Sequence, residues 1–63
     1  MCLARAYLRG NGEEEVLSEN VASVEAVNGK VVVTTILHEK KEMNATIVNV
    51  DFTNSIVLLE MKD

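Results

Sequence analysis

Hydrophobic and polar positions alternate along most of this chain, which is the period of a β-strand and not of a helix. In residues 1–8 the even positions are apolar, whereas Arg5 and Tyr7 occupy odd ones. Residues 31–37 are almost entirely β-branched, as expected for a strand buried on one face and partly covered on the other. We predict an all-β protein in which residues 31–37 form the central strand.

Turn signals divide the first half of the chain into hairpins. Glycine and asparagine tolerate positive φ, so Gly10-Asn11-Gly12 predicts a turn. Asn28-Gly29 lies between two apolar runs and favours a type I′ turn between antiparallel strands. Ser18-Glu19-Asn20 separates two further predicted strands, residues 13–17 and 21–27.

The second half contains a change of phase. Alternate apolar residues run through Met43, Ala45 and Ile47, but from Val48 onward the apolar set shifts by one position. A one-residue slip moves side chains to the opposite face, so we predict a bulge or a sharp bend here. The remaining predicted elements are a loop at 38–41, a turn within 51–55, a closing strand at 56–61 and a frayed end at 62–63.

About six short strands at intervals of about ten residues predict one small, bent antiparallel barrel of the SH3-like or Sm-like kind. It occupies residues 1–63 as a single domain. A domain of this size buries only about 60% of its unfolded surface, and one cysteine excludes an internal disulfide. We therefore expect a homodimer.

Composition narrows the functional classes. The chain is 48% hydrophobic with Tyr7 and Phe52 as its only aromatic residues, which predicts a small aliphatic core. A net charge of −4 and six dispersed basic residues weigh against nucleic acid as a partner. The apolar runs are far shorter than the roughly 20 residues of a membrane span, and no signal peptide is evident. We expect a cytoplasmic protein.

Few residues offer chemistry. One cysteine and one histidine in so small a chain do not indicate an enzyme. The sequence has no CxxC pair, so it does not predict a structural zinc site within one chain. The N-terminus is the better candidate, because the Met1 amine and the Cys2 amide and thiolate can form two fused five-membered chelate rings. That donor set suits square-planar Ni(II) or Cu(II), and binding would release protons. Two copies could share one ion through their Cys2 thiolates.

Each of these residues also has a simpler interpretation. Cys2 lies on the apolar face of its strand, and packing is the commoner role of such a cysteine. His38 is expected to be a solvated loop residue, with an auxiliary ligand or a pH-sensitive gate as the alternative. Met43 and Met61 are expected in the core. The acidic run at 13–15 is expected to be a solvated face.

Several segments together resemble the CooT family of small nickel-binding proteins. They are the start Met1-Cys2-Leu3-Ala4-Arg5-Ala6-Tyr7-Leu8, the glycine turn with its acidic residues, Thr35-Ile36-Leu37, Glu39-Lys40-Lys41-Glu42, and the ending from Val50-Asp51-Phe52 to Ile56-Val57-Leu58-Leu59-Glu60. The resemblance covers essentially the whole chain, and only the Met-Cys start carries chemistry.

The resemblance implies a homodimeric cytosolic accessory protein that binds Ni(II) through the cysteine at position two, here Cys2. Its client would be nickel-containing carbon monoxide dehydrogenase or the maturation factors of that enzyme, to which it would carry or hold nickel. The resemblance transfers no ligand role to His38. Two rival hypotheses remain: an Sm-like RNA-binding module, and a regulatory or scaffold dimer without a ligand.

Overall fold

The structure, a computed structural model, describes residues 3–62, and they form one small all-β fold with six strands. The predicted fold class is confirmed. The described residues contain no helix long and apolar enough to cross a membrane. The strands are β1 (Ala4–Gly10), β2 (Glu13–Val27), β3 (Lys30–Thr35), β4 (Lys40–Met43), β5 (Ala45–Asp51) and β6 (Ile56–Met61).

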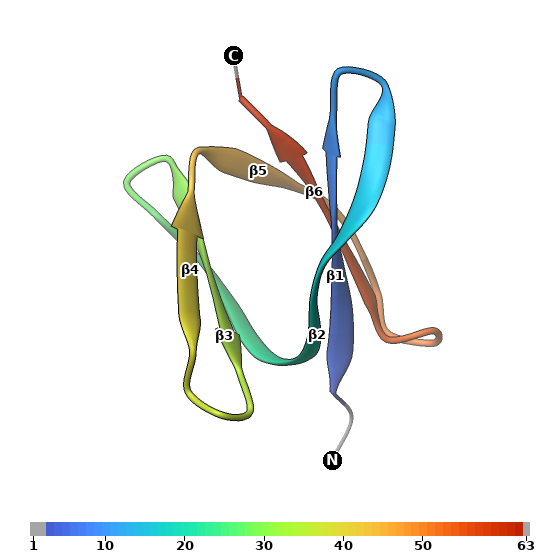
Figure 1. Ribbon diagram of the computed structural model, residues 1–63, viewed down its shortest axis with the longest axis vertical. Helices are drawn as coiled ribbons and strands as arrows, with labels where there is room; N and C mark the ends of the chain where they lie inside the picture. The colour runs from blue at the N-terminus through green and yellow to red at the C-terminus, as the bar shows by residue number, and fades with distance from the viewer. Residues whose placement is uncertain (1–2, 63) are drawn as a thin grey trace.

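All six strands belong to one sheet that curls into a half-barrel (Figure 1). Their order is β4-β3-β2-β1-β6-β5, so β4 and β5 lie at the two ends of the sheet although only Asn44 separates them in the chain. The Lys62 backbone N–H donates to the Asn44 carbonyl oxygen at 3.0 Å. This corner joins the two ends, and β3 and β5 lie against each other across the interior.

Strand direction and order differ from the sequence prediction in two respects. β1 and β6 pair in parallel, with Arg5 opposite Ile56, whereas the other four pairs are antiparallel. β3 lies second from one end of the sheet, so the predicted central position of residues 31–37 is wrong. Alternation reports which face of a strand is buried, and it carries no information about which strands become neighbours.

β2 is one bent strand where the sequence predicted two. The predicted break at residues 18–20 is instead a bend within continuous pairing, with register shifts opposite Ala6 in β1 and after Val21 in the pairing with β3. Asn20 accommodates the bend at φ 56°, a conformation that asparagine adopts more readily than most residues. Ser18 is buried at the bend, with 8% of its surface exposed.

The connection from β3 to β4 begins two residues earlier than predicted and has the predicted length of four residues. β3 ends at Thr35 because the chain turns there: the His38 N–H donates to the Thr35 carbonyl oxygen and the Thr35 N–H donates to the Glu39 carbonyl oxygen, both at 2.9 Å. Leu37 is therefore exposed in the turn. The predicted loop at 38–41 overlaps β4, whose Lys40 and Lys41 place charge on an edge strand.

Two local predictions are confirmed. Asn28 and Gly29 both have positive φ, 49° and 77°, as a type I′ hairpin turn requires. The register of β5 against β6 shifts between Ile47 and Asn49, where the sequence slip predicted a bulge.

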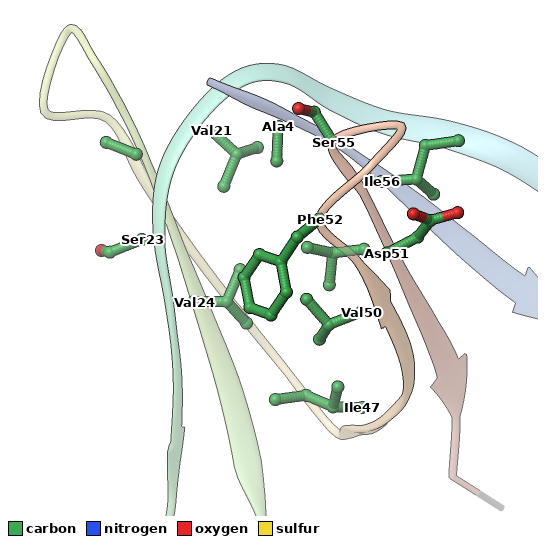
Figure 2. Close-up of a pocket in the computed structure, with 12 residues that line it drawn as sticks. Ala4, Val21, Ser23, Val24, Ile47, Val50, Asp51, Phe52, Ser55 and Ile56 are labelled. Carbon is green, nitrogen blue, oxygen red and sulfur yellow. The ribbon is translucent and has the colours of Figure 1, made fainter. Parts of the chain in front are cut away.

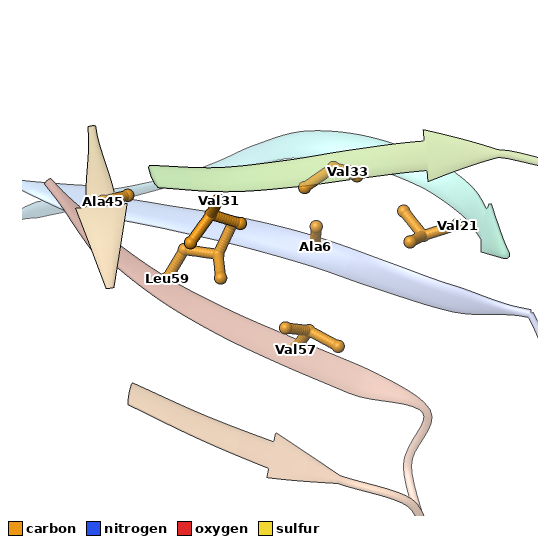
Figure 3. Close-up of a cluster of buried hydrophobic side chains, with 7 residues drawn as sticks. All are labelled: Ala6, Val21, Val31, Val33, Ala45, Val57 and Leu59. Atoms are coloured by element: carbon orange, nitrogen blue, oxygen red, sulfur yellow. The ribbon is translucent and has the colours of Figure 1, made fainter. Parts of the chain in front are cut away.

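The core lies inside the curl and is small and aliphatic, as predicted (Figure 3). β3 and β6 supply its largest fully buried side chains, which are Val31, Val33 and Leu59. Val31 and Val33 alternate with the half-buried Val32 and Thr34, which matches the burial predicted for this strand. The remaining buried apolar residues are Ala6, Val21, Ala45 and Val57.

The turn between β5 and β6 is closed by one carboxylate. Asp51 accepts hydrogen bonds from the Asn54 side-chain amide at 2.9 Å and from the Asn54 backbone N–H at 3.0 Å. Both bonds favour the ionised form of Asp51 and therefore lower its pKa, and the bond from the Asn54 side chain has the larger effect. The turn holds Phe52 outward, with 88% of its surface exposed.

Gly12 is required by backbone conformation, since its φ is +79°. We expect Gly12→Ala to lower the free energy of unfolding by about 1–2 kcal/mol, the cost of a left-handed alanine. Gly10→Ala is the matched control, because Gly10 lies in β1 and an added Cβ would make an ordinary 3.4 Å contact with Met61. Urea unfolding at one protein concentration measures both, and equal losses would contradict this assignment.

The Asp51–Asn54 turn predicts a pH effect. In Asn54→Ala the pKa of Asp51 should rise toward its ordinary value, which an NMR titration of the carboxyl carbon measures. A depressed folded-state pKa adds stability above the unfolded pKa and loses it as pH falls through the folded value. The stability difference between wild type and Asn54→Ala should therefore disappear in acid. The exposed Asn49 supplies a control, Asn49→Ala, and an unchanged Asp51 pKa in Asn54→Ala would refute the prediction.

Candidate functional site

The predicted metal ligands Cys2 and Met1 lie outside the described residues, so the site is approached from the start of β1. Ala4 pairs with Val21 of β2, and Val21 pairs with Thr35 of β3. These three positions form a row across one end of the sheet, about 10 Å long at the usual spacing between strands. β1 therefore begins at this end of the sheet.

Polar contacts fix the start of β1 between β2 and the β5–β6 turn. The Arg5 backbone N–H donates to the Ser55 carbonyl oxygen at 2.9 Å, and the Arg5 guanidinium forms an ion pair with the Glu19 carboxylate at 2.9 Å. Hydrogen bonds to the Tyr7 hydroxyl and to Glu19 raise the pKa of Arg5. The charges of Arg5 and Glu19 thus offset each other beside a polar notch that Leu3 also lines.

His38 reaches the same end of the sheet by a different route. Its backbone N–H donates to the carbonyl oxygen of Thr35, the β3 member of the row that includes Ala4. The His38 backbone has a φ of 67°, and its side chain is exposed. In Figure 1 the start of β1 and the β3–β4 turn lie at one end of the molecule. The solvated character predicted for His38 is confirmed. No local pattern predicts the position of His38, because strand order brings the two segments together.

The other candidate ligands fall elsewhere. Within residues 3–62, no group of three or more His, Cys, Asp and Glu side chains is arranged to hold a metal ion. Met43 packs against the core as predicted, but Met61 is 43% exposed near the end of β6, so its predicted core position is wrong. The acidic run at 13–15 is exposed, as predicted.

The sequence analysis missed an apolar cleft on the open side of the half-barrel (Figure 2). The cleft has a volume of about 340 Å³ and lies between residues 21–24 of β2 and residues 47–52 of β5 and the turn that follows. Val24, Val50 and Phe52 surround its opening, and Ala4 also lines it. The sequence did contain a signal for this cleft. Apolar residues lie on both sides of the β5 bulge, and because the bulge changes which face they occupy, one core cannot bury all of them.

Basic side chains are largely matched by acceptors in the described residues. Arg9 pairs with Glu60 at 3.1 Å, and Lys30 lies 3.9 Å from Glu42. Two further lysines, 41 and 62, donate to backbone carbonyl oxygens. Together with the Arg5–Glu19 pair, these contacts compensate charge locally, which does not favour a phosphate-binding surface.

Comparison with known proteins identifies the family. The family model described as CO dehydrogenase accessory protein CooT matches residues 1–60. The crystal structure of a candidate CooT from Carboxydothermus hydrogenoformans superimposes with a TM-score of 0.86 at 24% identity, covering 98% of this chain and 100% of that one, which is a likeness of fold. No curated protein matches. The chain therefore belongs to the CooT family of CO dehydrogenase accessory proteins.

Proposed function

We propose that this chain is a nickel-binding accessory protein that carries or holds Ni(II) for the maturation of nickel-containing CO dehydrogenase. The observation that carries the proposal is the family match, which extends over residues 1–60 and so includes Cys2. Nickel is the cargo of such a protein, and the protein performs no reaction on it. We expect it to act in the cytosol, with the dehydrogenase or its maturation factors as the client.

The donors that we propose are the Cys2 thiolate and, where the chain begins at Met1, the Met1 amine with the intervening amide. A thiolate with nitrogen donors suits Ni(II), and the chelate rings need no other part of the fold. At the end of the sheet near Ala4, the Arg5 guanidinium and the Glu19 carboxylate pair with each other at 2.9 Å.

We further propose that the protein works as a homodimer in which two Cys2 thiolates share one ion. A single Met-Cys start provides at most one thiolate and two nitrogens, whereas a square-planar ion has four positions. A second copy supplies the missing donor without any new residue type. Association would also stabilise the fold, because a core of only seven buried apolar residues provides little stability by itself.

The direct test is a calorimetric Ni(II) titration of wild type and Cys2→Ser. We expect Cys2→Ser to weaken binding by at least about 100-fold, since a hard hydroxyl replaces a soft thiolate. Met61→Leu is the matched control, because it removes an exposed sulfur at the other end of the sheet, and its affinity should equal that of wild type. Undiminished affinity in Cys2→Ser would refute the proposal.

Thermal stability gives an independent readout. Nickel that binds only the folded chain must raise its melting temperature, and the rise should be absent in Cys2→Ser. The fitted stoichiometry should be one ion per two chains. If no first-row metal shifts the melting temperature of wild type, the protein is a scaffold or regulatory dimer without a ligand.

A further inference from the structure

We infer that Lys41 is a positioning residue for nickel binding, because its side chain fixes the bend in β2 against which β1 begins. The inference rests on the nickel-binding function proposed above and adds to it a residue that is distant from Cys2 in the sequence. Lys41 does not touch the ion in this account. Its effect passes through the backbone of β2 and the Arg5–Glu19 ion pair to the start of β1.

The bend arises from extra residues in β2. Ala6 and Tyr7 are adjacent in β1, but their partners in β2 lie two residues apart, with Leu17 between them. A second extra residue lies within positions 19–20, which together face Arg5 alone. Extra residues of this kind bend a strand and leave the local hydrogen-bond ladder incomplete. Figure 1 shows the resulting curve of β2 between β1 and β3.

The segment from β3 to β4 supplies hydrogen bonds to the carbonyl oxygens of this bend. The Lys41 Nζ atom donates to the Leu17 carbonyl oxygen at 3.0 Å. The Ile36 backbone N–H, directly after β3, donates to the Asn20 carbonyl oxygen at 2.9 Å. β2 and β4 are not neighbours in the sheet, so the Lys41 bond links two strands that backbone pairing does not join. Lys41 therefore holds the bulge at Leu17 in place.

The place of Lys41 in β4 explains how its side chain reaches the bend. Lys41 pairs with the fully buried Val33, whereas Lys40 pairs with Thr34. Successive residues of a strand point to opposite faces, so Lys41 lies on the concave face of the sheet and Lys40 on the convex face. A lysine on an edge strand also discourages pairing with other chains, but that role needs no partner. The bond to Leu17 is what indicates a brace.

The bend in turn fixes the start of β1. Glu19 follows the bulge at Leu17 by two residues and forms the 2.9 Å ion pair with Arg5. Ala4, which follows Cys2 by two residues, is the next β1 residue to pair with β2. A metal site keeps its affinity only where the elements that carry its ligands are held within about 0.5 Å. Loosening the bend should therefore weaken nickel binding without removing any ligand.

Calorimetric Ni(II) titration and amide hydrogen exchange of Lys41→Met test this role on the full chain. We expect the Ni(II) affinity to fall by about three- to tenfold, the effect of one lost hydrogen bond, although Cys2 is intact. The Arg5 amide, which donates to the Ser55 carbonyl oxygen, should exchange faster by a similar factor in the absence of metal. Lys41→Arg retains a donor at this position and should restore both values to near those of wild type.

Two other lysines provide matched controls. Lys40→Met removes the neighbouring lysine from the opposite face of β4 and should leave the Ni(II) affinity and the Arg5 exchange rate unchanged. The Lys62 Nζ atom also donates to a carbonyl oxygen, that of Gly29 at 2.6 Å, but β6 runs parallel to β1 and so ends away from the start of β1. Lys62→Met should lower the melting temperature by a similar amount to Lys41→Met, yet bind Ni(II) like wild type.

Equal Ni(II) affinity in Lys41→Met and wild type, or equal losses of affinity in Lys41→Met and Lys62→Met, would overturn the inference. A Lys41→Met chain that lacks β-sheet by circular dichroism would also overturn it, because Lys41 is exposed and its loss leaves the seven core residues in place. The nickel proposal is judged separately, by Cys2→Ser. If wild type binds no nickel, that proposal fails, and the Arg5 exchange rate still decides whether Lys41 braces the bend.

Discussion

The packing of Val31 and Val33 of β3 against Leu59 of β6 is the interaction on which the rest of this structure depends. These side chains come from opposite arms of the curled sheet, and their burial holds the arms together. The core has too little volume to fill the whole curl, so the barrel stays open between β2 and β5. The apolar cleft is thus a consequence of how few large side chains the chain commits to its interior.

The same curl determines what surrounds the start of β1. Because the sheet bends back through the Asn44 corner, β6 arrives beside β1 in parallel and places the β5–β6 turn next to Arg5. The bend in β2 brings Glu19 to the same place, where it pairs with Arg5. The start of β1 therefore lies beside the Arg5–Glu19 ion pair and the largely apolar cleft that Ala4 lines.

Much of this fold is predictable from sequence, for specific reasons. The Asn28-Gly29 turn and the β5 bulge follow from local rules of backbone conformation and side-chain phase, and both are confirmed. The continuous path of β2 through Ser18 and the parallel β1–β6 pair are not local, because they depend on how the whole sheet closes. For the candidate site, residue type indicates Cys2, but only strand order shows that His38 and the cleft lie near the same end.

We propose that two copies share one nickel ion through their Cys2 thiolates. X-ray absorption at the nickel edge tests this sharing most directly, on wild-type protein loaded with one ion per two chains. We expect two sulfur donors per nickel, and none in Cys2→Ser. A wild-type spectrum with one sulfur donor, or with only nitrogen and oxygen donors, would contradict a shared site.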